Sequence, residues 1–211
     1  MALPEVAQAQ ALSNLMSSVL KEYAPSSLAV VGCSTGNGFD HINTACTSRV
    51  IGVDINPDYL KVLQARFGGR IPCLELINAD IAAGDFRIDP VSMVFAGLVF
   101  EYVDVLCALR SIARCLSCGG ILAAVLQEPS TESAPVSVTR YKSLELLSPV
   151  MKLVPAGEFS AMCGSVGLDK IRTDTIVLKK GKSFFVGFYR KVTGPGPQAD
   201  PDRTLRRAQR F

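Results

Sequence analysis

The sequence VVGCSTGNGFD, residues 30–40, decides the fold, because closely spaced glycines follow directly on an apolar run. That run, SLAVVG at 27–32, is typical of a strand buried on both faces of a parallel sheet. The spacing predicts a helix from about Asn37. Glycines at such a junction permit positive backbone torsions and close ligand approach, and free amides at a helix start favour negative charge. We therefore expect a ligand at this loop.

Four more apolar runs further along the chain predict strands. They are RVIGVDI at 49–55, CLELINADI at 73–81, SMVFAGLVF at 92–100 and ILAAVLQ at 121–127. Helical segments separate them. Asn56 is placed to cap one helix, with Pro57 at its first position and Gly68-Gly69 at its end. Residues 104–120 have helical spacing and are expected to end at Gly119-Gly120. This alternation favours a doubly wound sheet with helices on both faces.

The two ends of the domain differ from this pattern. Residues 11–20 have apolar positions at helical spacing, so 1–24 is predicted to be a lead-in helix that ends before Pro25. Residues 128–157 hold four prolines and no clean period, and we expect them to form a substrate cap. After a helix at about 158–166, strands at 168–178 and 183–191 flank the hairpin signal KKGK. The prediction is one α/β domain over 1–190, with a doubly wound, mostly parallel seven-stranded sheet and a terminal hairpin supplying one antiparallel strand.

Composition excludes several classes of protein. The chain has 211 residues, of which 48% are apolar and 19% charged, so it can bury one substantial core. It has neither an 18-residue apolar run nor a signal-peptide pattern, which predicts a cytoplasmic protein without membrane association. Seven scattered cysteines then predict reduced thiols. Cys115 and Cys118 are the only close pair and His41 is the only histidine, so no metal site is expected.

The net charge of +3 comes from the C-terminus. Residues 1–190 hold 17 basic and 17 acidic residues, whereas 191–211 hold five basic and two acidic ones. The body therefore has no electrostatic footprint for nucleic acid. The tail is rich in Pro, Gly and Arg, which predicts a disordered basic extension. It is either a solvated appendage or a weak contact for RNA or an acidic partner.

Three positions point to a nucleoside ligand. Counted from Gly32, the loop matches one of three glycines in the dinucleotide pattern G-x-G-x-x-G and two of three in G-x-G-x-G. Asp54 ends the second strand, 22 residues later, where a carboxylate accepts ribose hydroxyls; it could instead initiate the next helix beside Asn56. Asp80 could accept an adenine amine with Ile81 against the ring, or act only as a turn aspartate.

Over residues 28–190 the chain resembles the class I S-adenosylmethionine-dependent methyltransferases. LAVVGCSTGNG is similar to their first motif, VIGVDIN to the ribose-binding strand, INADI to the adenine motif and LRSIARCLSCGGIL to a late helix-turn-strand signature. LVFEYVD is similar to a segment often written with E-H-V. The resemblance implies a Rossmann-like fold and S-adenosylmethionine as cofactor. The cofactor-binding residues it implies are Gly32, Cys33, Ser34, Gly36, Asn37, Asp54, Ile55, Asp80, Ile81 and Gly97.

The chain departs from that family at two loop positions. Val30 stands where many members have an acid that helps to hold the methionine ammonium, and Ser34 replaces the middle glycine. The loop would hold the amino-acid carboxylate and the sulfonium-bearing chain. The resemblance implies in-line methyl transfer to an unidentified acceptor, a small molecule or a protein side chain, with Glu101, Tyr102 and Tyr141 as candidates to face the methyl group.

Two other functions stay open, as does the oligomeric state. One is a cofactor-binding module without activity, which acts as a sensor or partner subunit. The other is a different nucleoside-using enzyme, such as an aminopropyltransferase or a nicotinamide oxidoreductase.

Overall fold

The computed structural model describes residues 4–128, 151–178 and 182–192. The expected disordered tail, Tyr141 and most of the expected cap therefore lie outside the described residues. The helices are α1 (Pro4–Tyr23), α2 (Pro57–Phe67), α3 (Val105–Cys115) and α5 (Ala156–Ser165). The strands are β1 (Ser27–Val31), β2 (Arg49–Asp54), β3 (Leu74–Asn78), β4 (Val91–Gly97), β5 (Leu116–Gln127), β6 (Leu168–Val177) and β7 (Ser183–Lys191). Two short 3-10 helices are η1 (Phe39–His41) and η2 (Phe100–Tyr102).

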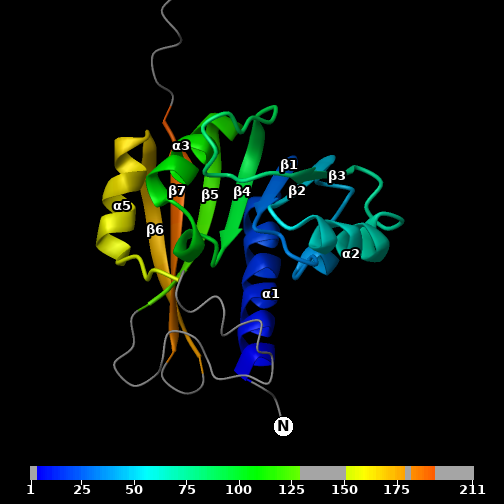
Figure 1. The fold of residues 1–211 in the computed structure, drawn as a ribbon, viewed down its shortest axis with the longest axis horizontal. Helices are drawn as coiled ribbons and strands as arrows, with labels where there is room; N and C mark the ends of the chain where they lie inside the picture. The colour runs from blue at the N-terminus through cyan, green and yellow to red at the C-terminus, as the bar shows by residue number, and fades with distance from the viewer. Residues whose placement is uncertain (1–3, 129–150, 179–181, 193–211) are drawn as a thin grey trace, which may run out of the picture.

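The seven strands form one sheet in the order β3-β2-β1-β4-β5-β7-β6 (Figure 1). Strands β1 to β5 pair in parallel, whereas β7 runs antiparallel to both β5 and β6. This confirms the predicted doubly wound sheet with a terminal hairpin and one reversed strand. Because β2 and β4 lie on opposite sides of β1, the strand order reverses there. Ligands bind at the carboxyl ends of strands at such a point.

Helices pack on both faces of the sheet, as the alternation of strand residues requires. In β1, Ala29 and Val31 face the core shared with α3 and α5, whereas Leu28 and Val30 face the core shared with α1 and α2. The amphipathic α1 contributes Met16 to that second core. Asn56 caps α2 as predicted, since its side chain accepts a hydrogen bond from the Asp58 amide.

The helix predicted from about Asn37 is wrong. Between β1 and β2 the chain forms turns and η1. Left-handed torsions recur at Ser34 (φ 47°), Gly36 (φ 88°) and Gly38 (φ 86°), and this alternation prevents a continuous right-handed helix. Helix α1 also already covers the sheet face at this point. It packs so closely on the loop that a Cβ on Gly38 would lie 2.6 Å from Sδ of Met16.

The predicted end of α3 at Gly119-Gly120 is also wrong. The helix ends at Cys115, and β5 begins at once with the fully buried Leu116, which pairs with Val91 of β4. Gly120 lies inside the strand, where a Cβ would be 2.8 Å from the Ser117 carbonyl oxygen. The glycine pair therefore marks an irregular strand with close backbone contacts.

Candidate functional site

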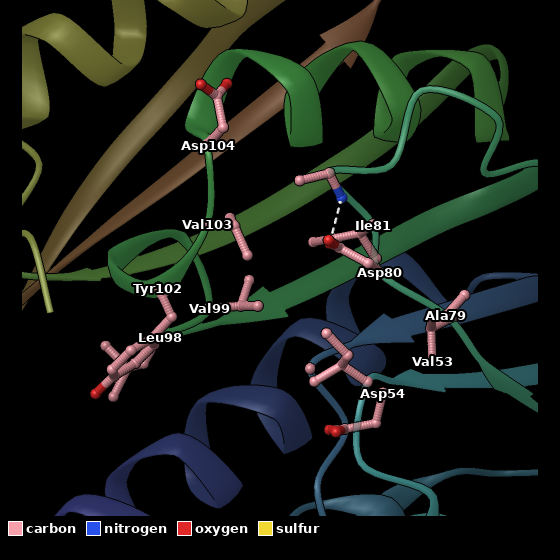
Figure 2. A pocket seen from close by; sticks show the side chains of 13 residues that line it. Val53, Asp54, Ala79, Asp80, Ile81, Leu98, Val99, Tyr102, Val103 and Asp104 are labelled. Atoms are coloured by element: carbon pink, nitrogen blue, oxygen red, sulfur yellow. Dashed lines mark hydrogen bonds between the residues drawn. The ribbon is translucent and has the colours of Figure 1, made fainter. Parts of the chain in front are cut away.

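A pocket of about 530 Å³ lies at the carboxyl ends of β1 to β4, at the point where the strand order reverses (Figure 2). Each of these strands, or the loop that follows it, supplies part of the wall. The lining residues are Gly32, Val53, Asp54, Ile55, Ala79, Asp80, Ile81, Ala82, Leu98, Val99, Tyr102, Val103 and Asp104. The sequence prediction included Gly32, Asp54, Ile55, Asp80, Ile81 and Tyr102 from this set.

Asp54 joins the ends of two strands. It is the last residue of β2 and is 9% exposed. The Ser34 amide donates to its Oδ2 at 2.8 Å and the Asn56 amide donates to its Oδ1 at 2.9 Å. Each carboxylate oxygen keeps a further acceptor site. Asp54 thus fixes the glycine loop and can still accept hydroxyl groups from a ligand in the pocket. The helix cap itself belongs to Asn56, not to Asp54.

The loop after β3 forms the opposite wall. The Ala82 amide donates to Oδ1 of Asp80 at 2.8 Å, the contact that is dashed in Figure 2. Ile81 is 4% exposed and packs into the core beside the pocket. Ile55, in contrast, is 68% exposed at the end of β2. These side chains line this part of the pocket with apolar surface and one carboxylate.

Most of the glycine loop faces away from the pocket. Only Gly32 lines it, whereas Cys33 is buried in the core on the α2 side, where burial raises the pKa of its thiol to about 12. A Cβ on Gly36 would lie 2.8 Å from Cε2 of Phe67 in α2. The side chain of Asn37 donates to the Ala9 carbonyl oxygen at 2.9 Å. These contacts make the loop a packing element between α1, α2 and the sheet.

The segment after β4 contributes residues that the sequence interpretation missed. The predicted Gly97 ends β4 and does not line the pocket, but Leu98 does, in a left-handed conformation with φ 55°. Val99 follows, and its Cγ2 would lie 2.9 Å from a Cβ on Gly32, so the two residues pack closely. Asp104 caps α3 by accepting the Cys107 amide at 2.8 Å. Strand lengths alone could not show which residues of LVFEYVD turn toward the pocket.

Glu101 and Tyr102 lie differently despite being adjacent. Glu101 is 1% exposed and outside the pocket lining; the Gln127 amide donates to its Oε1 at 2.7 Å, and Oε2 has no partner among the described residues. Burial raises the pKa of this carboxyl. Tyr102 lines the pocket and is 38% exposed. Burial, and then the charge of Glu101, raises the pKa of its hydroxyl.

The raised pKa of Glu101 predicts a pH-dependent stability. A carboxyl with a raised folded-state pKa binds its proton more tightly in the folded state, so the contribution of Glu101 to the stability of wild type falls as pH rises above about 4.5, the ordinary value. Glu101→Gln keeps an acceptor for the Gln127 amide and cannot ionise. We expect its free energy of unfolding, relative to wild type, to increase from pH 4.5 toward pH 8 in urea titrations.

Glu75→Gln is the matched control for this experiment. Hydrogen bonding by Arg49 lowers the pKa of Glu75, so this carboxylate is fully ionised above its ordinary range. The stability difference of Glu75→Gln from wild type should therefore be flat between pH 5 and 8. A flat profile for Glu101→Gln as well would contradict a raised pKa of the buried carboxyl at position 101.

Among the residues that the structure describes, the lining of the pocket is acidic and includes no cationic side chain. Asp54, Asp80 and Asp104 line it, and no lysine, arginine or histidine is among its lining residues. His41 lies outside it and contacts Oγ of Ser13 at 3.0 Å. No group of three or more His, Cys, Asp or Glu side chains that could hold a metal ion occurs in the described part of the chain. Such a pocket attracts a cation and repels phosphate groups.

Comparison with known proteins relates this chain to a described type of domain. Residues 29–124, which run from β1 into β5, match the model of the methyltransferase domain. The seven-stranded order with its antiparallel β7 is the class I methyltransferase sheet. Residues 29–124 are thus a methyltransferase domain, and the fold is that of solved S-adenosylmethionine-dependent methyltransferases. A comparison with curated protein sequences finds no match.

Solved structures share the fold of this chain at low identity. The N-methyltransferase NodS from Bradyrhizobium japonicum WM9, in complex with S-adenosyl-L-homocysteine, has a TM-score of 0.66 at 13% identity over 86% of each chain. Geranyl diphosphate C-methyltransferase from Streptomyces coelicolor A3(2) has 0.65 at 12%, over 85% of this chain and 77% of that one. The [4+2]-cyclase SpnF has 0.68 at 14%, over 88% and 83%.

No helix within the described ranges of this chain is both long and apolar enough to cross a bilayer.

Proposed function

We propose that this chain is an S-adenosylmethionine-dependent methyltransferase that moves a methyl group in line to a small-molecule acceptor, with a protein side chain as the second class of acceptor. The observation that carries the proposal is Asp54. Two backbone amides hold its carboxylate at 2.8 and 2.9 Å at the edge of an acidic pocket. A carboxylate that is already fixed loses little freedom when it accepts two ribose hydroxyls.

The other lining residues favour binding of an adenosyl sulfonium over binding of a phosphate-bearing nucleotide. In this proposal Asp80 accepts the adenine amine and Ile81 and Ile55 contact the ring; the support is that all three line the pocket. The three lining carboxylates favour a cationic sulfonium, whereas they oppose the two phosphates of a nicotinamide dinucleotide. S-adenosylmethionine supplies an electrophilic methyl group on a cationic sulfur whose leaving thioether is neutral, so no protein acid is needed to expel it.

The protein's own task is then to position the two reactants. Tyr102 lines the pocket, is partly exposed and is the described residue best placed to meet an acceptor. Its raised pKa keeps the hydroxyl protonated at neutral pH, so it would orient an acceptor as a hydrogen-bond donor. Glu101 lies behind this wall, and its carboxyl binds the end of β5 at the Gln127 amide. Its role in this proposal is to position Tyr102.

A second candidate function is a cofactor-binding module without methyl transfer. It is favoured by the close packing of Val99 on Gly32, which reduces the space for a cofactor at that residue. It is also favoured by the hydrogen bond from the Ser34 amide to Asp54, because this amide is then not free to bind a cofactor. The fold does not prescribe methyl transfer, since SpnF, which shares it, carries the name of a cyclase.

The test is turnover. The purified full-length chain is incubated with S-adenosylmethionine and pooled small-molecule extracts, and S-adenosylhomocysteine is quantified by mass spectrometry against the same reaction with Asp54→Ala. We expect many equivalents of product per wild-type chain and a strongly reduced yield with the variant. Cofactor binding that never exceeds one product per chain, with small molecules or with protein acceptors, would establish the binding module instead.

A further inference from the structure

We infer that the pocket binds the adenosine and sulfur of its cofactor but does not hold the amino-acid carboxylate. It should therefore accept adenosyl thioethers and sulfoniums that lack this carboxylate at least as tightly as those that carry it. The inference rests on the proposed function. It differs from the expectation that the glycine loop grips the carboxylate of the methionine chain.

Hydrogen bonding within the loop is the first ground. A bound carboxylate needs free backbone donors or a cationic side chain. The Cys33 amide donates to the Val53 carbonyl at 3.1 Å, the Ser34 amide to Asp54 at 2.8 Å and the Gly36 amide to the Cys33 carbonyl at 3.0 Å. A ligand could use the Ser34 amide only by breaking the contact that fixes Asp54. These three amides therefore serve the protein's own structure.

Steric contacts are the second ground. Gly32 is the only residue of the loop that lines the pocket, and the side chain of Val99 packs against it. Beyond Gly32, helix α1 covers the loop: Met16 lies against Gly38, and the side chain of Asn37 donates to the Ala9 carbonyl at 2.9 Å. Beyond Gly32 the loop thus packs against α1 and does not line the pocket.

Electrostatics is the third ground. A carboxylate that stays within the pocket meets Asp54, Asp80 and Asp104, and none of the lining side chains in the described ranges is a cation. Like charges at this range repel, whereas an ammonium or a sulfonium is attracted. A ligand with the ammonium alone therefore fits the pocket better than the zwitterion. The charge of the lining therefore favours decarboxylated adenosyl compounds as a class of ligand.

The test compares three ligands that share the adenosine and the sulfur. S-adenosylhomocysteine has the full tail, S-adenosyl-3-thiopropylamine lacks only its carboxylate, and 5′-methylthioadenosine lacks the tail. We expect calorimetry on the full-length protein to give the thiopropylamine an affinity equal to or above that of S-adenosylhomocysteine, with 5′-methylthioadenosine within about threefold of it. If the loop held the carboxylate, its charge-assisted bonds would make S-adenosylhomocysteine tighter by roughly tenfold or more.

The outcomes separate this inference from the proposed function. S-adenosylhomocysteine binding more than threefold tighter than the thiopropylamine overturns the inference and leaves the proposed function standing. Failure of all three ligands to bind overturns the proposed function. Asp54→Ala provides the site control, because a ribose contact is common to the three ligands. The variant should weaken all three, and S-adenosylhomocysteine no more than the other two, because its carboxylate is also relieved of the charge of Asp54. Stronger weakening of S-adenosylhomocysteine than of the other two would contradict the inference.

Discussion

Replacing Asp54 by alanine should abolish the preference of this protein for adenosine over 2′-deoxyadenosine. In wild type, a carboxylate that accepts the 2′-hydroxyl contributes about 1.5–3 kcal/mol, or roughly 10- to 150-fold in affinity. Asp54→Ala should bind both nucleosides equally weakly. Calorimetric titration of wild type and variant with both nucleosides measures the coupling free energy between the Asp54 side chain and the 2′-hydroxyl of the ligand.

This comparison is needed because Asp54 also has a structural role. The variant loses the acceptor for the Ser34 and Asn56 amides, so we expect it to be less stable by about 2–4 kcal/mol even without ligand. A drop in affinity alone would therefore be ambiguous, whereas loss of hydroxyl discrimination would not. Equal discrimination by wild type and Asp54→Ala would contradict a ribose contact at this residue.

Gly36→Ala should be among the most destabilising single substitutions in the chain. Gly36 has φ 88°, where an alanine costs about 1–2 kcal/mol, and the new methyl group would lie 2.8 Å from the Phe67 ring. Displacing that ring from the α2 core adds about 1–3 kcal/mol. The sum of about 2–5 kcal/mol corresponds to a fall in melting temperature of about 5–15 °C for a chain of this size.

Gly69→Ala is the matched control for Gly36→Ala. It follows the end of α2, has nothing within 4 Å of the added Cβ and has no left-handed torsion. Its melting temperature should therefore stay close to that of wild type. If Gly36→Ala melted like Gly69→Ala but bound the cofactor poorly, the loop would be a ligand cradle and not the packing element described above.

The strands could be predicted from sequence because each is a short apolar run bounded by turn residues, and burial on both faces of a parallel sheet demands that pattern. The connections could not. The chain after Gly32 was interpreted as the start of a helix, but the left-handed torsions at Gly36 and Gly38 depend on contacts with Phe67 and Met16, which are distant in sequence. Likewise, pairing with Val91 makes Leu116 a strand residue.

The residues of the candidate site likewise fall into those that could be predicted from sequence and those that could not. Asp54 ends β2, and Asp80 and Ile81 directly follow β3, so their place at the pocket edge follows from the strand assignment and the topology rule. Val99 and Asp104 follow β4 in a segment whose course is set by the left-handed Leu98. No spacing rule predicts that conformation for a leucine. The buried position of Glu101 likewise depends on the amide of Gln127, far along the chain.

Titration of the wild-type protein with S-adenosylhomocysteine, beside NAD⁺ and ATP at equal concentration, tests the central claim most directly. The acidic, cation-free lining and the fixed Asp54 predict one-to-one binding of S-adenosylhomocysteine and no measurable heat from either phosphate-bearing nucleotide. Binding of NAD⁺ or ATP in preference to S-adenosylhomocysteine would contradict the assignment of this pocket to an adenosyl sulfonium cofactor.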